Sequence, residues 1–265
     1  MSPQSGAAAL LQPATPHVTL ADVRAAAARI QGAVLRTPTI RSDALSKACG
    51  ATIHLKLDNL QATGAFKERG AANRIALLSA RERAAGVIAM SAGNHAQAVA
   101  RHAALAGISA TIVMPKYTPA TKVTRTEGWG ATVVLHGETL AEAAAHAYDL
   151  ASREGLTFIH PYDDPAVIAG QGTAALEMLE DFPEIDTLAV PVGGGGLVTG
   201  CAAAAMELKP GTVVYGVEVE GYPAMAQPVT RPPPPTGTAS VSISGKSSSI
   251  SSAAVPWPAI TAGSS

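Results

Sequence analysis

The stretch 64–70, "GAFKERG", decides the expected fold, because it puts a lysine where the chain leaves a strand for a helix. The strand-like run "TIHLKL" precedes it at 52–57, and a helical stretch follows at about 66–79. Lys67 stands between the aromatic Phe66 and the charged pair Glu68–Arg69. The simplest interpretation is a first-turn lysine with a solvated head, since most lysines lie on protein surfaces. The rest of the chain has to decide whether that interpretation holds.

The change from strand to helix recurs along the chain, which predicts an α/β fold. Short loops between the elements indicate twisted, mainly parallel sheets flanked by helices. In such sheets ligands bind in the loops that follow the carboxyl ends of the strands. Thr19 is expected to cap an earlier helix that stops at Gly32. Strands are expected at 52–57, 87–90, 110–115, 131–135, 157–159, 187–192 and 212–219, and helices at about 66–79, 94–106, 118–128, 138–154, 171–181 and 197–208.

Composition narrows the functional classes. The chain has 265 residues, of which 47% are hydrophobic, and a net charge of −1, so it can form one large domain or two small ones. The balanced charge argues against nucleic acid and against an anionic membrane as partners. Glycines interrupt the uncharged stretch 187–206, which is therefore not expected to span a membrane. Cys49 and Cys201 are isolated and fit a reduced, cytoplasmic protein.

The composition changes abruptly at Pro228. The last 38 residues hold four consecutive prolines, ten serines, one arginine, one lysine and no acid. Such a segment cannot bury enough apolar surface to offset its chain entropy. Residues 228–265 are therefore predicted to form a disordered tail rich in Ser and Pro.

Two more strand-to-helix loops carry candidate chemistry. In "SAGNHA", residues 91–96, small residues at a helix start leave backbone N–H groups open to a carboxylate or phosphate. The alternative is ordinary helix capping by Ser91 or Asn94. In "GGGG", Gly193 to Gly196, no Cβ obstructs the approach to a helix start, which suits a phosphate group. The spacing is not the GxGxxG of dinucleotide-binding proteins, so a nucleotide binder is the weaker interpretation.

The three loops together indicate one kind of site. They offer a lysine beside an aromatic ring, a seat for an anion with an asparagine, and a phosphate cradle. This set fits a phosphorylated aldehyde cofactor joined to the lysine as a Schiff base, with a separate place for an amino-acid carboxylate.

At this point the sequence resembles a known family, the threonine/serine dehydratases (threonine ammonia-lyases) of the pyridoxal-phosphate fold type II enzymes. The matching segments occur in the family's order over roughly residues 18–227. They are "LKLDNLQATGAFKERGAANRI", "SAGNHAQAVA", "IVMPKYTPATKV", "GQGTAALEMLE" and "VPVGGGGLVTG".

The resemblance implies roles for individual residues. Lys67 matches the Schiff-base lysine, Phe66 the aromatic beside the cofactor ring, and Asn94 the residue that hydrogen-bonds the cofactor's phenolic oxygen. Other matches form two groups: the substrate carboxylate loop with Ser91, Ala92, Gly93, Asn94 and His95, and the phosphate loop with Gly193, Gly194, Gly195 and Gly196. The implied cofactor is pyridoxal 5'-phosphate, and the implied reaction converts L-threonine or L-serine to a 2-oxo acid and ammonia.

Burial beside an aromatic is expected to lower the pKa of Lys67, so that its free amine can remove the Cα proton. Glu68 and Arg69 receive no catalytic role. Ala92 stands where the similar serine racemases carry a serine acid, which favours elimination over racemisation. Glu218 resembles a ligand of the family's cation site, but its expected partner position is Ala224, so no metal is predicted.

The resemblance also implies two lobes. The small lobe is expected at 58–157, and the large lobe at 1–57 with 158–227. Relatives continue past this point with further strands and helices, so the C-terminal part of the large lobe is expected to be missing. The second hypothesis is therefore a truncated or frameshifted pseudoenzyme. The expected partner is a small amino-acid substrate, with a homo-oligomer possible.

Overall fold

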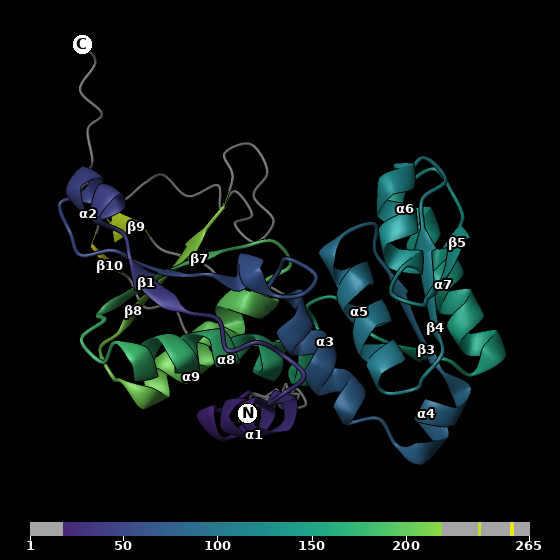
Figure 1. Cartoon of the computed structure of the whole chain (residues 1–265), viewed down its shortest axis with the longest axis horizontal. Coiled ribbons are helices and arrows are strands. Elements are labelled where there is room, and N and C mark those ends of the chain that lie inside the picture. The colour runs from purple at the N-terminus through teal and green to yellow at the C-terminus, as the bar shows by residue number, and fades with distance from the viewer. Residues whose placement is uncertain (1–17, 219–237, 240–254, 257–265) are drawn as a thin grey trace, which may run out of the picture.

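The structure is a computed structural model that describes residues 18–218, 238–239 and 255–256. Figure 1 shows two α/β bodies side by side, with α3 between them. The helices are α1 (Leu20–Ile30), α2 (Asp43–Cys49), η1 (Asp58–Leu60, a 3₁₀ turn), α3 (Lys67–Ala76), α4 (Ala80–Ala85), α5 (Asn94–Leu105), α6 (Ala120–Glu127), α7 (Leu140–Glu154), α8 (Pro165–Asp181) and α9 (Gly196–Leu208). The strands are β1 (Thr39–Arg41), β2 (His54–Lys56), β3 (Val87–Met90), β4 (Ala110–Met114), β5 (Thr132–Leu135), β6 (Thr157–Phe158), β7 (Thr187–Pro191), β8 (Val213–Val217), β9 (Thr238–Ala239) and β10 (Val255–Pro256).

The body that includes α5, α6 and α7 is built on a parallel four-stranded sheet in the order β5-β4-β3-β6. Alternate residues of β3 face opposite sides, as a pleated strand requires. Val87 and Ala89 pack in the apolar cluster that includes α5. Ile88 packs in a second cluster with Ala143 and Ala147 of α7. The sheet is therefore covered by helices on both faces, and the predicted α/β fold class is confirmed.

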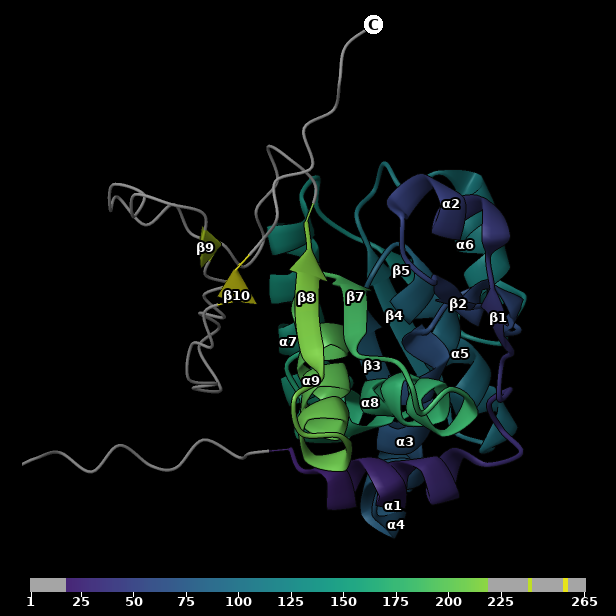
Figure 2. The same ribbon diagram turned by 90° about the vertical axis from the view of Figure 1, so that its left-hand side faces the viewer.

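Within residues 18–218, the other body contains two separate pairs of strands. β7 and β8 are parallel and lie side by side in Figure 2, while β1 and β2 are antiparallel. A third apolar cluster joins α1, α8, α9 and β7, with Val23, Leu176, Leu188 and Cys201 among its buried members.

Three helices cross closely at glycines next to the site. A Cβ on Gly170 of α8 would lie 2.4 Å from the backbone oxygen of Arg69 in α3. A Cβ on Gly172 would lie 2.6 Å from the backbone oxygen of Gly200 in α9. Because no side chain fits at these points, α3, α8 and α9 pack backbone to backbone. This contact fixes α3, which begins at Lys67, relative to α9, which begins at Gly196.

Several element boundaries differ from the sequence predictions. The helix expected from 171 begins at Pro165, because Asp164 caps it by accepting from the N–H groups of Ala166 and Val167. The helix expected at 66–79 ends at Ala76, and a new capping box at Ser79 begins α4. Elements β1, α2 and η1 were not predicted from the sequence. Thr19 caps α1 through a capping box, as predicted.

The predicted disordered tail, 228–265, lies outside the described residues except for the short antiparallel pair β9–β10, which was not predicted. The expected cation-site position Ala224 also lies outside them. Over the described ranges, every helix is too short or too polar to cross a membrane.

Candidate functional site

Lys67, the first residue of α3, is half-buried. Its Nζ donates a hydrogen bond to the backbone oxygen of Pro161 at 2.6 Å, and lies 5.3 Å from the ring centroid of Phe66. Burial lowers the pKa of this amine from its usual value of 10.5 to about 8. The interpretation of Lys67 as a solvated surface lysine is therefore wrong. The amine therefore loses its proton closer to neutral pH than a solvated lysine does.

The glycine loop meets the same segment of chain as Lys67. Cβ atoms added to Gly194 and Gly196 would lie 2.1 Å from the ring of Tyr162 and 2.8 Å from its backbone oxygen. Tyr162 directly follows Pro161, whose carbonyl holds the amine of Lys67. The two predicted loops thus lie on neighbouring residues. At Gly193, by contrast, an added Cβ would meet nothing within 4 Å.

The third loop reaches this segment as well. The ring Nε2 of His95 lies 2.9 Å from the backbone oxygen of Ile159. Helix α5 begins at Asn94 behind Gly93, and neither Ser91 nor Asn94 caps it; the hydroxyl of Ser91 instead accepts from the N–H of Gly93. The capping alternative is therefore wrong, and the first N–H groups of α5 remain open to an anion. All three loops thus contact the one short segment 159–162.

Two consecutive buried charges, Glu68 and Arg69, hold α3 in place, and Arg69 makes the larger number of contacts. Arg69 is fully buried and makes two-pronged hydrogen bonds to the carboxylates of Asp58 and Glu177, at 2.7–3.0 Å. Lys56 Nζ also pairs with Glu177, at 2.6 Å. Burial disfavours the charge of Arg69, but its hydrogen bonds to both carboxylates raise the pKa of the guanidinium above the usual value. Arg69 therefore ties the Lys67 helix to η1 and α8.

Glu68 is buried on the other side of the same turn. Its carboxylate pairs with Arg101 at 2.9 Å and lies 3.3 Å from His102, both on α5, and it accepts from the N–H of Thr63. Burial alone would raise the pKa of Glu68, but the hydrogen bonds from His102 and Thr63 and the charge of Arg101 hold it below its usual value. Consecutive residues after Lys67 thus anchor α3 to both bodies.

Sequence reasoning missed the segment on which the loops meet. Ile159, Pro161 and Tyr162 were regarded as part of a strand or left unassigned. A signal was present, because "IHPYDDP" follows the carboxyl end of a predicted parallel strand, where ligand-binding loops are found. His160 belongs to this segment too, and its ring packs edge-on against Tyr162 at 4.7 Å.

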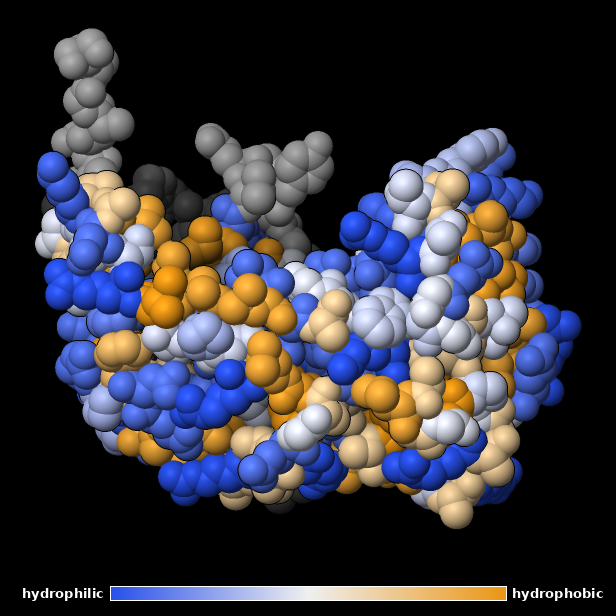
Figure 3. All heavy atoms as spheres, in the orientation of Figure 1, coloured by the Kyte–Doolittle hydropathy of each residue, from blue (hydrophilic) through white to orange (hydrophobic). Residues whose placement is uncertain are grey.

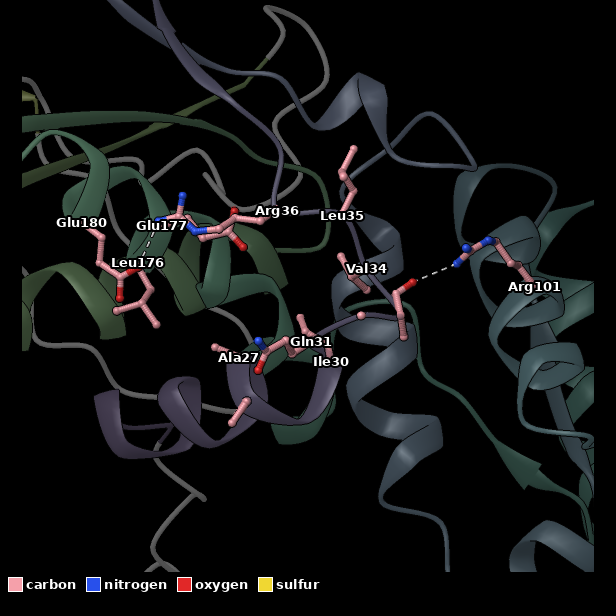
Figure 4. Close-up of a pocket in the computed structure, with 13 residues that line it drawn as sticks. Ala27, Ile30, Gln31, Val34, Leu35, Arg36, Arg101, Leu176, Glu177 and Glu180 are labelled. Carbon is pink, nitrogen blue, oxygen red and sulfur yellow. Dashed lines mark hydrogen bonds and ion pairs between the residues drawn. The ribbon is translucent and has the colours of Figure 1, made fainter.

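A separate pocket of about 670 Å³ opens beside α1 and α8 (Figure 4). None of the predicted site residues lines it. Arg101 stands at one end and donates to the backbone oxygen of Ala33, and Arg36 and Glu180 stand at the other. The pocket shares Arg101, the partner of Glu68, and Glu177, the partner of Arg69, with the surroundings of the site.

The fold and the site define a class of α/β protein in which a half-buried lysine and a glycine loop at a helix start contact neighbouring residues, Pro161 and Tyr162. A family model described as pyridoxal-phosphate dependent enzyme matches residues 30–263. The chain belongs to this family. The matched range runs past Pro228, where the quoted motifs gave no resemblance.

Named relatives are similar over much of the chain. An L-threonine ammonia-lyase of Thermotoga maritima is 47% identical over 214 residues, which are 81% of this chain and 53% of the relative. The solved structure of maize serine racemase has 37% identity and a TM-score of 0.76, over 78% of this chain and 63% of that one. The processed threonine deaminase isoform 2 from Solanum lycopersicum has 35% identity and a TM-score of 0.73, over 83% and 66%. The chain thus spans little more than half of the first of these.

Proposed function

We propose that this chain carries the catalytic site of a pyridoxal-phosphate dependent dehydratase. The reaction converts L-threonine to 2-oxobutanoate and ammonia, and L-serine to pyruvate and ammonia. The observation that carries the proposal is the half-buried amine of Lys67 on the carbonyl of Pro161, one residue from the Tyr162 that covers the glycine loop. The named relatives, among them a threonine ammonia-lyase and a threonine deaminase, support this substrate class.

The residues present fit the cofactor. Reaction with an aldehyde requires an unprotonated amine, and the lowered pKa of Lys67 raises the fraction of that form near neutral pH. A phosphate requires open N–H groups, and α9 begins behind Gly195, which is left-handed at φ 87° and forms no side-chain cap. Phe66 and Asn94 would flank the ring. The chemistry that bound pyridoxal phosphate supplies is a sink for the electrons released when Cα loses its proton.

Each remaining task falls to a group of this chain. The open N–H groups at the start of α5 would bind the substrate carboxylate and orient its Cα. The amine of Lys67, when unprotonated, would take the Cα proton. Loss of the β-hydroxyl as water, followed by uptake of water and release of ammonia, balances the reaction.

Racemisation is the second candidate, since serine racemases are similar in structure. That reaction needs a proton donor on the opposite face of the ring from the lysine. The position that the resemblance gives to this donor is Ala92, which cannot carry a proton. Elimination is therefore the favoured outcome.

We also propose the division into a small lobe, 58–157, and a large lobe formed by 1–57 and 158–227. Separate apolar clusters support it: one joins β3, β4 and α5, and another joins α1, α8, α9 and β7. The site then lies where the two lobes meet at α3.

Borohydride reduction of the protein mixed with pyridoxal phosphate tests the proposal. A pyridoxyl mass should appear on the peptide that contains Lys67, and L-threonine should yield 2-oxobutanoate without D-allothreonine, the epimer that racemisation at Cα would give. Lys67→Ala should lose both the label and turnover. Asn94→Ala should keep the label and lose about 10- to 150-fold in turnover, the equivalent of a charged hydrogen bond of about 1.5–3 kcal/mol. A label spread over other lysines would refute the proposal.

A further inference from the structure

The side chain of His95 is buried, with 3% of its surface exposed, although it stands in the first turn of a helix at the site. Its Nε2 lies 2.9 Å from the carbonyl oxygen of Ile159. Within the described residues its other ring nitrogen, Nδ1, is buried without a hydrogen-bond partner. Burying a ring nitrogen without a hydrogen-bond partner costs free energy, so the burial of His95 needs a functional or structural explanation.

The two nitrogens fix the protonation state of the ring. A carbonyl oxygen only accepts, so Nε2 carries the proton and donates it to Ile159. Nδ1 then keeps its lone pair, since a proton there would be buried without an acceptor. Burial first, with the charges of Lys67 and His160 in addition, lowers the pKa of His95 to about 3, while the hydrogen bond to Ile159 partly opposes this. The His95–Ile159 hydrogen bond therefore does not change over the pH range in which Lys67 titrates.

Ile159 is only two residues before Pro161. The carbonyl of Ile159 is held by His95, and the carbonyl of Pro161 receives Nζ of Lys67. Between them, the ring of His160 accepts from the N–H of Asp163 at 2.7 Å, which closes the turn that follows. One short segment is thus held at one end by α5, and it holds the amine of α3 at the other.

We propose that His95 is a positioning residue, which holds the segment 159–161 against the amine of Lys67 through the carbonyl of Ile159. This deepens the proposed function, on which its catalytic importance rests. The side chain need not touch the substrate, whereas the backbone N–H of the same residue stays available to a carboxylate. Without the donor at Nε2, the segment would move away from Lys67 and water would reach the amine.

Competitive acetylation of the protein without cofactor or substrate tests this. The rate at Lys67 relative to that at the exposed Lys47 is followed by mass spectrometry from pH 6 to 11. In the unchanged protein the relative rate should rise with a midpoint near pH 8. In His95→Leu the midpoint should move toward 10.5, and each unit of that rise lowers labelling at pH 7 about tenfold. His95→Gln keeps a donor and should stay near the unchanged protein.

Controls separate this role from general damage. His146→Leu removes a half-buried histidine of α7 that stacks on His136, away from residues 159–161, and should leave the midpoint unchanged. If His95→Leu does not fold, His95→Phe serves in its place. Amide exchange at Tyr162 and Asp163 should quicken in whichever variant lacks the donor. An unchanged midpoint in that variant, or an equal shift with Gln, would overturn the proposal. Neither result bears on whether the cofactor binds, because none is present.

Discussion

At the scale of single residues, the proposed chemistry depends on Lys67, because burial disfavours the protonated form of its amine. The pKa of Lys67 is about 8 in the folded protein, against 10.5 as its usual value. Between these two pH values the unfolded chain binds more protons than the folded one. This residue therefore makes the free energy of unfolding increase as the pH rises. Below about pH 8 both states are protonated, and the buried charge destabilises the fold to a constant extent.

A pH series of denaturant unfolding tests this sign. Lys67→Met removes the buried charge. Relative to the unchanged protein, its free energy of unfolding should therefore be higher by a larger amount at pH 7 than at pH 10. The advantage should shrink between about pH 8 and pH 10.5. The exposed Lys47→Met provides the control and should give a difference that does not vary with pH. A pH-independent difference for Lys67→Met would mean that the amine is not desolvated.

Arg69 shows what a buried charge does for the fold. It is 0% exposed and bonds two carboxylates, so Arg69→Met would leave Asp58 and Glu177 close together with Lys56 as their remaining cation. We expect a loss of about 3–5 kcal/mol in the free energy of unfolding. Arg36→Met breaks pairs with Glu180 and Asp181 on a side chain that is 52% exposed, and should cost less than about 1 kcal/mol. Similar small losses in both variants would show that Arg69 is not held as tightly as its geometry indicates.

At the scale of elements, the structure gives a second reason for glycine in the loop 193–196, which the sequence did not reveal. An open approach for a phosphate was predicted for all four positions, and Gly193 fits that prediction. At Gly194 a side chain is excluded by the ring of Tyr162 instead. The loop before α9 is therefore shaped by the segment after β6, 32 residues earlier in the chain (194 − 162).

A double-mutant cycle tests this contact. Gly194→Ala should destabilise the fold by about 1–3 kcal/mol, because its Cβ would overlap the ring of Tyr162. Tyr162→Ala should remove most of that cost when the two changes are combined, so the coupling energy should be clearly different from zero. Gly193→Ala, with open space around its Cβ, should leave the free energy of unfolding unchanged. Additive effects at 194 and 162 would contradict the contact.

Local sequence was sufficient for some elements and insufficient for others. The capping box at Thr19 and the apolar run "VIAM" at 87–90 act within a few residues, so α1 and β3 were predictable. The start of α8 was also encoded locally, in Asp164 and Pro165, and was overlooked. The burial of Arg69 could not be read this way, because its partner Glu177 is 108 residues away. The site was predictable in its three loops, and the shared segment 159–162 was not.

At the scale of the whole molecule, the described chain leaves unusual surfaces uncovered. From 38 to 60 no residue is buried, although this stretch forms β1, α2, β2 and η1. Ile40, Leu45 and Leu60 are 43–49% exposed, and hydrophobic atoms gather over β1 in Figure 3. Strands β7 and β8 form a pair of their own, with Val217 at its end 53% exposed. Two-stranded pairs are marginal by themselves, and open edges and apolar faces favour association.

These surfaces lead to a prediction about complementation. A chimera would carry, in addition, the part of the Thermotoga maritima relative that has no counterpart in this chain. If that part covers β1, α2 and β8, the chimera should melt at a higher temperature, retain pyridoxal phosphate through dialysis and scatter less light than the present chain at the same concentration. A version cut at Gln227 should behave like the 265-residue chain, because the Ser- and Pro-rich stretch that it lacks holds too few apolar residues to form a core. Thermal melts, cofactor absorbance and light scattering would compare the three. If the 265-residue chain already equals the chimera in all three measurements, the exposed surfaces need no further cover, and the site between the two bodies is stable with the elements it has.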